Sequence, residues 1–199
     1  MIDSLLQWAT STMEQGGLLA LAVLLLIENL FPPIPSEAVL PLGGLLVAEG
    51  TFPLAGALAA STAGSLVGAW LIYALGRYGG RPLVLRFHAV LRFTEEELDR
   101  ADHWFDRHGG WVVFWARMLP FLRSVVSVPA GASEMPLGRF TLLTAAGSLL
   151  WNTLLISAGI ALGDRYQVIV PWLDRFAWLV VVACVVALAW WIVTRVRSR

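Results

Sequence analysis

The sequence predicts an all-α integral membrane protein with two inverted repeats, each a re-entrant helical hairpin followed by a transmembrane helix. A C-terminal transmembrane helix and amphipathic surface helices complete the predicted fold. The 199 residues are 58% hydrophobic and only 14% charged, whereas a soluble domain carries about 25% charged residues. Three uncharged stretches are long enough to cross a bilayer, and two other apolar stretches are broken by proline.

The composition excludes several classes of protein. A chain of this length cannot bury so much apolar surface in a soluble globule, which rules out a soluble enzyme, a disordered tail and a secreted disulfide scaffold. The formal net charge is +0, so no bulk attraction to nucleic acid is expected. The single cysteine, Cys184, lies in an apolar run, and the sequence has no His-Glu-x-x-His motif. No metal or cofactor is therefore expected.

Three stretches have the length of transmembrane helices, because about 20 apolar residues cross the hydrocarbon core. They are residues 51–76, 140–163 and 176–194. We expect a single membrane domain over residues 1–199. Its parts are residues 16–76 (first hairpin and span), 77–108 (cytoplasmic amphipathic segment), 109–163 (second hairpin and span) and 171–194 (final span).

Residues 16–48 do not fit a simple span. The apolar arm over residues 17–31 would measure about 22 Å as a helix, which is too short for about 30 Å of hydrocarbon. Prolines remove amide donors and disfavour helix at the preceding residue. The break holds Pro32, Pro33 and Pro35. We therefore expect a hairpin that enters the membrane, turns at depth and leaves on the same side.

Residues 109–135 repeat this plan, with expected breaks near Pro120 and Pro129. Non-helical backbone survives at membrane depth only inside protein or beside a wet cavity, so the two hairpins should face each other inside a helical shell. Between them, residues 77–108 are polar, and Thr94 and Glu97 form a capping-box pattern. This segment is expected to form amphipathic surface helices, with a small soluble cap as an equal alternative.

A shift of 83 positions aligns the two halves. Residues 63–66 (Ala-Gly-Ser-Leu) fall on residues 146–149 with the same letters, and Gly76 falls on Gly159. The alternative is that both segments are simply small-residue packing faces. The residues assigned to helix packing are Gly64, Gly68, Gly76, Ala130, Gly131 and Gly147.

The arginine distribution sets the expected topology. Arg195, Arg197 and Arg199 place the C-terminus in the cytoplasm, since Arg-rich flanks stay inside. Counting back through the spans places residues 77–107, with six Arg, in the cytoplasm as well. The first hairpin then enters from outside and the second from the cytoplasm. Inverted repeats with broken helices that meet at mid-membrane are typical of transporters.

Four ionisable residues fall where lipid should be: Glu28, Glu37, Arg117 and Arg123. Such charges are costly in a membrane and must be paired or hydrated. One interpretation is a pair of buried salt bridges, although these are weak stabilisers. The other is an anion site, because Arg forks suit phosphate and burial favours a neutral carboxylate that can exchange a proton.

The two hairpins also resemble a known family. The first reads Glu-Asn-Leu-Phe-Pro-Pro-Ile-Pro-Ser-Glu over residues 28–37, and the second reads Arg-Met-Leu-Pro-Phe-Leu-Arg over residues 117–123, followed by Ala130-Gly131. Both patterns are similar to the DedA family of membrane proteins, also called VTT or SNARE-associated domain proteins. The resemblance covers roughly residues 16–163. One departure is Ser65, where some members carry an acid.

The resemblance implies lipid movement between leaflets, and for bacterial members the return of undecaprenyl phosphate to the cytoplasmic leaflet. We therefore expect a non-enzymatic, proton-coupled lipid transporter in the bacterial plasma membrane. Arg117 and Arg123 would bind the phosphate head group, and Glu28 and Glu37 would carry protons. The expected partners are polyprenyl phosphate or phospholipid, membrane lipids and protons, without nucleic acid. Homo-oligomerisation stays open.

Alternatives remain. The nearest is a phospholipid flippase or scramblase, and another is a non-transporting membrane scaffold. An intramembrane enzyme is disfavoured, because nucleophilic catalysis needs a base beside the nucleophile. All three histidines, His88, His103 and His108, fall in the segment expected at the cytoplasmic surface.

Overall fold

The structure is a computed structural model that describes residues 2–30, 36–91, 109–119 and 122–163, with side chains for residues 8–30, 39–79, 109–119 and 122–163. Several expected features lie outside these residues: the span at 176–194, the arginine tail, the capping box at Thr94, and Pro32, Pro33, Pro35 and Pro120. The chain divides into two compact units, Met1–Ala161 and Leu162–Arg199. The following description concerns the first unit.

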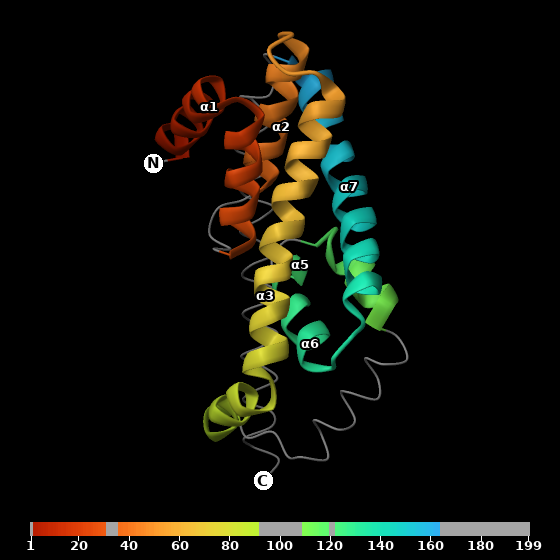
Figure 1. Cartoon of the computed structure of the whole chain (residues 1–199). Helices are drawn as coiled ribbons and strands as arrows, with labels where there is room; N and C mark the ends of the chain where they lie inside the picture. Colours follow the sequence, from red (N-terminus) through yellow and green to blue (C-terminus); the bar gives the residue numbers. More distant parts are fainter. Residues whose placement is uncertain (1, 31–35, 92–108, 120–121, 164–199) are drawn as a thin grey trace, which may run out of the picture. The chain divides into compact units, whose positions relative to one another are not determined.

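Every regular element in the described residues is helical, which confirms the all-α prediction. The elements are α1 (Ile2–Leu30), α2 (Ser36–Ala48), α3 (Leu54–Leu91), α5 (Leu122–Val125), α6 (Ser127–Ala132) and α7 (Leu137–Leu162), and residues 109–116 are also helical (Figure 1). Three stretches are long and apolar enough to cross a membrane: Trp8–Leu30, Leu54–Gly79 and Leu137–Leu162. The chain is therefore a multi-pass membrane protein, and two of these apolar helices lie within three residues of the spans expected at residues 51–76 and 140–163.

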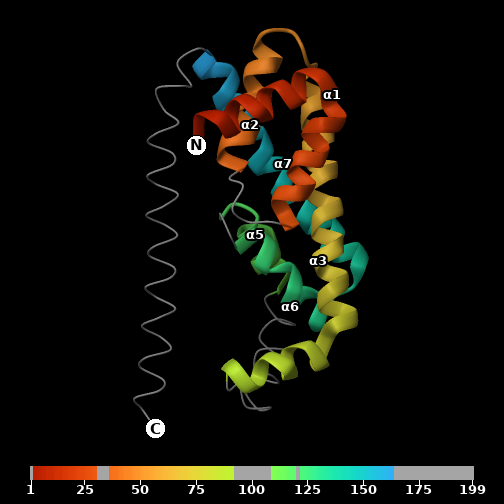
Figure 2. The same ribbon diagram turned by 90° about the vertical axis from the view of Figure 1, so that its left-hand side faces the viewer.

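Helix α1 consists of two helices joined at a bend. Gly17 has φ 62° and ψ −150°, a conformation that glycine adopts readily and other residues do not. Figure 2 shows the part before Gly17 turning sharply away from the part after it. Residues 18–30 therefore form a separate arm of about 20 Å, which is shorter than the apolar length of Trp8–Leu30 suggests.

Helix α3 is longer than the sequence predicted. We expected a span ending near Gly76 and separate surface helices after it, but α3 continues without interruption to Leu91. Its last part turns away from the main axis in Figure 2.

Helices α3 and α7 run antiparallel. Near the end of the α3 span, Trp70 Nε1 donates to Thr141 Oγ1 at 2.9 Å. Near its start, Ser61 Oγ lies 3.2 Å from the side-chain amide of Asn152, towards the end of α7. Both helices therefore form one antiparallel pair, against which the hairpins pack (Figure 1).

The first arm of each hairpin runs parallel to the span that follows it in sequence. We call residues 18–48 the first hairpin and residues 109–132 the second. Along α3, a Cβ at Gly56 would meet Leu18, and one at Gly68 would meet Asn29 at 2.6 Å. Along α7, a Cβ at Gly147 would lie 2.7 Å from the carbonyl oxygen of Phe114. Because α3 and α7 are antiparallel, the two first arms point in opposite directions.

The second arms cross over to the other span. In α2, Gly44 lies against the backbone of Ile156 in α7, and Gly159 of α7 lies against Pro41. In the same way, Gly131 of α6 lies against the backbone of Tyr73 in α3, and Gly76 lies against Val128. No Cβ fits at these approaches without overlapping a backbone carbonyl oxygen, so each hairpin holds both long helices together. Gly64 lies equally close to Ala22, and Ala130 is fully buried.

The helical interruption nearest to Pro129 lies between α5 and α6, at Val126. Pro129 itself lies inside α6, in its first turn, where its missing N–H needs no partner within the helix. The interruption lies three residues before Pro129, next to the Val125 carbonyl that an amide at residue 129 would have bound.

Candidate functional site

The tips of the two hairpins meet at an ion pair. Glu28, in the last turn of α1, pairs through Oε2 with Nη2 of Arg123 in α5, and each side chain is only 6% exposed. Glu28 and Arg123 are far apart in sequence, and they meet because each hairpin packs against both α3 and α7. A buried pair of this kind requires both charges, because the loss of one leaves the other desolvated and unpaired.

Arg117 has a different environment. It follows helical residues 109–116 and is 2% exposed. Its Nη2 donates to Ser127 Oγ at 3.0 Å and to Thr144 Oγ1 at 3.2 Å. Its Cζ lies 5.7 Å from the ring centre of Phe140. All these contacts are to neutral groups.

Two nitrogens of Arg117, Nε and Nη1, have no hydrogen-bond partner among the described residues. These N–H groups belong to one planar fork whose other prong is held by Ser127 and Thr144. A buried cation with unsatisfied donors is costly. The arrangement can accept an anion at Nε or at Nη1 without breaking an existing bond.

The structure brings together two of the four ionisable residues predicted at depth, Glu28 and Arg123. Arg117 lies on the same hairpin as Arg123 and is buried without a carboxylate partner among the described residues. Glu37 lies in the first turn of α2, and its side chain is outside the described residues. Whether Glu37 joins the site stays a prediction.

Sequence reasoning missed the hydroxyl ligands of Arg117. Ser127 and Thr144 are both fully buried, but they are separated from Arg117 by 10 and 27 positions. The only available signal was a polar residue in an otherwise apolar span.

Thr144 also lies 83 positions after Ser61, which is the shift that aligns the two halves. Ser61 is fully buried and contacts Asn152 at 3.2 Å in either orientation of that amide.

Two further polar atoms lie buried near the first hairpin tip. Asn29 donates from Nδ2 to the carbonyl oxygen of Leu25 at 3.3 Å. Its Oδ1 and the hydroxyl of Ser65 have no partner among the described residues. Ser65 therefore offers only a neutral hydroxyl to the interior.

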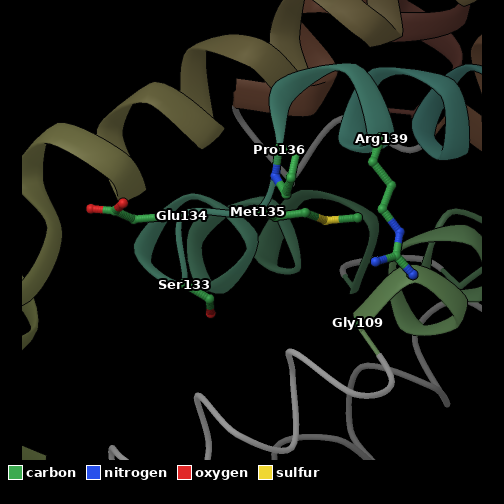
Figure 3. A pocket seen from close by; sticks show the side chains of 7 residues that line it. Gly109, Ser133, Glu134, Met135, Pro136 and Arg139 are labelled. Atoms are coloured by element: carbon green, nitrogen blue, oxygen red, sulfur yellow. The ribbon is translucent and has the colours of Figure 1, made fainter.

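In the part of the chain that the structure describes, two cavities open near the start of α7, and neither is lined by Arg117 or Arg123. The larger, about 650 Å³, lies between α3 and the turn before α7 and includes Arg77 and Glu134. The smaller, about 100 Å³, lies on the other side of Pro136 and includes Gly109 and Arg139. In Figure 3, the Glu134 and Arg139 side chains extend to opposite sides of Pro136.

The described residues contain no group of three His, Cys, Asp or Glu placed to hold a metal ion. The buried charged residues in the described part of the chain are Glu28, Arg117 and Arg123, at the hairpin tips. They lie between apolar helices that can cross a bilayer, which defines the class: a multi-pass membrane protein with a buried charged site where two hairpins meet.

The chain belongs to the VTT domain family, also called the DedA family, whose profile matches residues 34–161. It is 33% identical to undecaprenyl phosphate transporter A of Bacillus subtilis (strain 168), covering 100% of this chain and 96% of that protein. It is 27% identical to undecaprenyl phosphate transporter A of Staphylococcus aureus (strain NCTC 8325 / PS 47), covering 97% of each.

Another relative carries a different kind of name. The chain is 38% identical to the alkaline phosphatase-like protein of Lactococcus lactis subsp. cremoris (strain MG1363), covering 85% of this chain and 81% of that protein. No solved structure is significantly similar to the chain. The comparisons therefore establish the family and place named lipid-phosphate transporters among the relatives.

Proposed function

We propose that this protein transports a lipid phosphate across the bacterial plasma membrane, with undecaprenyl phosphate as the substrate. The observation that carries the proposal is Arg117, a buried guanidinium with Nε and Nη1 unpartnered among the described residues. A phosphate oxygen is a strong acceptor for such N–H groups. Two relatives named undecaprenyl phosphate transporter A support the choice of substrate.

In the proposed cycle, the phosphate binds Arg117 and then competes with Glu28 for Arg123. In this proposal, Glu28 is the partner of Arg123 when no phosphate is bound. When phosphate takes the place of the carboxylate, Glu28 loses its counter-charge in a low-dielectric interior, which favours its protonation. Proton uptake keeps the occupied site closer to neutral. Glu37 remains a second candidate for the same role.

We also propose that the two halves are inverted repeats with re-entrant hairpins. Equivalent close contacts support this proposal. The shift of 83 positions that aligns the two halves takes Tyr73 to Ile156 and Gly76 to Gly159. Tyr73 and Gly76 in α3 contact the second arm of the second hairpin, and Ile156 and Gly159 in α7 contact the second arm of the first hairpin. Since the first arms point in opposite directions, each hairpin can open to one side of the membrane. In this proposal the C-terminus is cytoplasmic, which the arginine-rich tail favours.

The experiment measures binding of a short-chain polyprenyl phosphate to the full-length protein in nanodiscs. Arg117→Lys keeps the charge and removes the fork, so we expect affinity to fall about tenfold or more. Arg139→Gln is the matched control, because Arg139 is an exposed arginine at the smaller cavity. Thermal melting of each variant shows whether the fold is retained.

The outcomes separate the alternatives. Unchanged binding by a folded Arg117→Lys protein would overturn the phosphate site and favour a scaffold, which tolerates that change. Equal competition by phosphatidylglycerol and polyprenyl phosphate would identify a phospholipid flippase or scramblase. Release of inorganic phosphate from the lipid would identify an enzyme. Competition by the phosphate-free polyprenol would show that the lipid tail, and not Arg117, determines binding.

A further inference from the structure

The larger cavity points to a second lipid site. We propose that the groove between α3 and the turn before α7 binds the phosphate of a polyprenyl phosphate at the membrane surface, with Arg77 as the phosphate ligand and Glu134 as its resting counter-charge. This inference rests on the proposed function and adds a site outside the buried hairpin tips. In the proposed orientation, the groove lies at the cytoplasmic end of α3.

The groove has the position and lining that a membrane lipid requires. It measures about 650 Å³, and Arg77 lies two residues before the end of the apolar stretch Leu54–Gly79, where lipid head groups are expected. Its walls include Trp70, 38% exposed, and Leu137, 53% exposed. Trp70 is held in place by its bond to Thr141. A charged head and an apolar chain can therefore be accommodated together.

One nitrogen of the Arg77 guanidinium makes a hydrogen bond within the protein. Its Nη1 donates to the hydroxyl of Tyr73 at 3.1 Å, while the side chain as a whole is exposed to the groove. The carboxylate of Glu134 lines the same groove and attracts Arg77 electrostatically, without forming an ion pair within 4.0 Å among the described residues. As far as the described residues show, the remaining donors of Arg77 are thus available to a phosphate.

Glu134 occupies a backbone position that suits glycine better. Its φ is 53°, in the left-handed region that costs a residue with a Cβ more than it costs glycine. The turn after α2 has the same hydrogen-bond pattern but places Gly50, with φ 78°, at this position. The matching bonds run from Gly50 N to Val47 O, Thr51 N to Leu46 O, Glu134 N to Gly131 O and Met135 N to Ala130 O.

The comparison of these turns indicates a role for the carboxylate. A glycine would satisfy the turn, as it does at residue 50, whereas Glu134 accepts the strained backbone and places a negative charge opposite Arg77. When no phosphate is bound, the negative charge of Glu134 balances the positive charge of Arg77. It also limits how tightly a phosphate is held, so the lipid can leave.

Tyr73 separates this groove from the buried arginine. Its hydroxyl donates to the carbonyl oxygen of Met135 and accepts from Arg77. Its ring lies 4.6 Å from that of Phe140, over which Arg117 is placed. A phosphate bound by Arg77 would therefore be two aromatic rings away from Arg117, and movement of Tyr73 would open the route between them.

The test uses the full-length protein in nanodiscs with a photo-reactive amino acid at position 137 or 142. Leu137 lines the groove, while Leu142 is an exposed α7 residue, 70% exposed, that does not. The probe is a short-chain polyprenyl phosphate, and the adduct is measured by mass spectrometry. We expect an adduct at 137 and little at 142, suppressed by excess polyprenyl phosphate but not by polyprenol or inorganic phosphate.

Charge variants then test the named residues. Arg77→Gln should reduce the adduct at 137 about tenfold, and Glu134→Gln should increase it. Arg139→Gln should leave it unchanged. An adduct that is insensitive to Arg77→Gln, or equal labelling at 137 and 142, would overturn the inference. Suppression by inorganic phosphate would show a free-anion site instead of a lipid site.

The two proposals can fail separately. Arg117→Lys should weaken binding at the hairpin tips about tenfold or more and leave the adduct at 137, because the groove does not include Arg117. If tight binding depends on Arg117 but no adduct forms at 137, only the groove inference fails. If the adduct depends on Arg77 while Arg117→Lys binds and transports normally, the groove stands and the proposed hairpin-tip site fails.

Discussion

Glu28 and Arg123 form a buried ion pair that joins the last turn of α1 to α5, the two hairpin tips whose first arms point in opposite directions. This contact couples the tips of the two hairpins. Any movement that separates the hairpins must break the pair or provide each charge with another partner. In the proposed cycle, phosphate provides the partner for Arg123 and a proton neutralises Glu28.

Removing one member of the pair should destabilise the protein strongly. For Glu28→Gln or Arg123→Gln alone, we expect a loss of about 3 to 5 kcal/mol in unfolding free energy, because the remaining charge is desolvated and unpaired. The double variant Glu28→Gln/Arg123→Gln should recover much of this loss, as measured by denaturant unfolding in detergent. The double variant should still fail to transport. Recovery of transport together with stability would show that the pair is structural only.

Binding of lipid phosphate should strengthen as pH falls through the titration of Glu28. Protonation releases Arg123 from Glu28, and linkage requires that binding in turn promotes protonation. Glu28→Gln, in the variant molecules that fold, should bind without this pH dependence. The measurement is polyprenyl phosphate affinity between about pH 5.5 and 8.5, corrected for ionisation of the ligand near pH 6. A wild-type pH profile in Glu28→Gln would transfer the proton role to Glu37 or remove it.

Glycines at the helix crossings should not tolerate alanine. A Cβ at Gly76 or Gly159 would overlap the backbone carbonyl of the opposing hairpin arm, so Gly76→Ala and Gly159→Ala should each cost about 1 to 3 kcal/mol. Gly138 is the control, because a Cβ there meets nothing within 4 Å. Gly138→Ala should be neutral or slightly stabilising. Equal melting temperatures for all three variants would contradict the close crossings.

The hydroxyl of Tyr73 should contribute to stability beyond its ring. Tyr73→Phe keeps the ring beside Phe140 and leaves the Met135 carbonyl unpaired, so we expect a loss of about 1 to 3 kcal/mol. Tyr78→Phe is the control, since Tyr78 is 85% exposed. Thermal unfolding of both variants tests the difference. If Tyr73→Phe left the stability unchanged, water would be replacing the hydroxyl. The bond to Met135 would then not be what separates the groove from Arg117.

The left-handed turns predict opposite effects at equivalent positions. Glu134→Gly should stabilise the fold by about 1 kcal/mol, and Gly50→Glu should destabilise it by a similar amount. Glu134→Gln keeps the backbone cost and removes only the charge, so it separates strain from electrostatics. Melting temperatures provide the comparison. A destabilising Glu134→Gly would show that the carboxylate supports the fold directly.

The sequence by itself determined the class of fold and the positions of two spans. Uncharged runs at residues 51–76 and 140–163 are sufficient evidence, because hydropathy reports the solvent that a segment prefers and needs no knowledge of its neighbours. The same logic singled out Glu28, Arg117 and Arg123, since a charge in an apolar run is conspicuous whatever its partner. The resemblance in the two hairpins was enough to indicate the family.

Tertiary structure alone decided how these residues combine. Glu28 pairs with Arg123, while Arg117 contacts Ser127 and Thr144. The bend at Gly17, the extension of α3 to Leu91 and the position of Pro129 inside α6 were also beyond sequence reasoning. Composition and spacing describe each segment separately. Pairing depends on where the arms cross the antiparallel helices, and that is set by close backbone contacts between residues far apart in the chain.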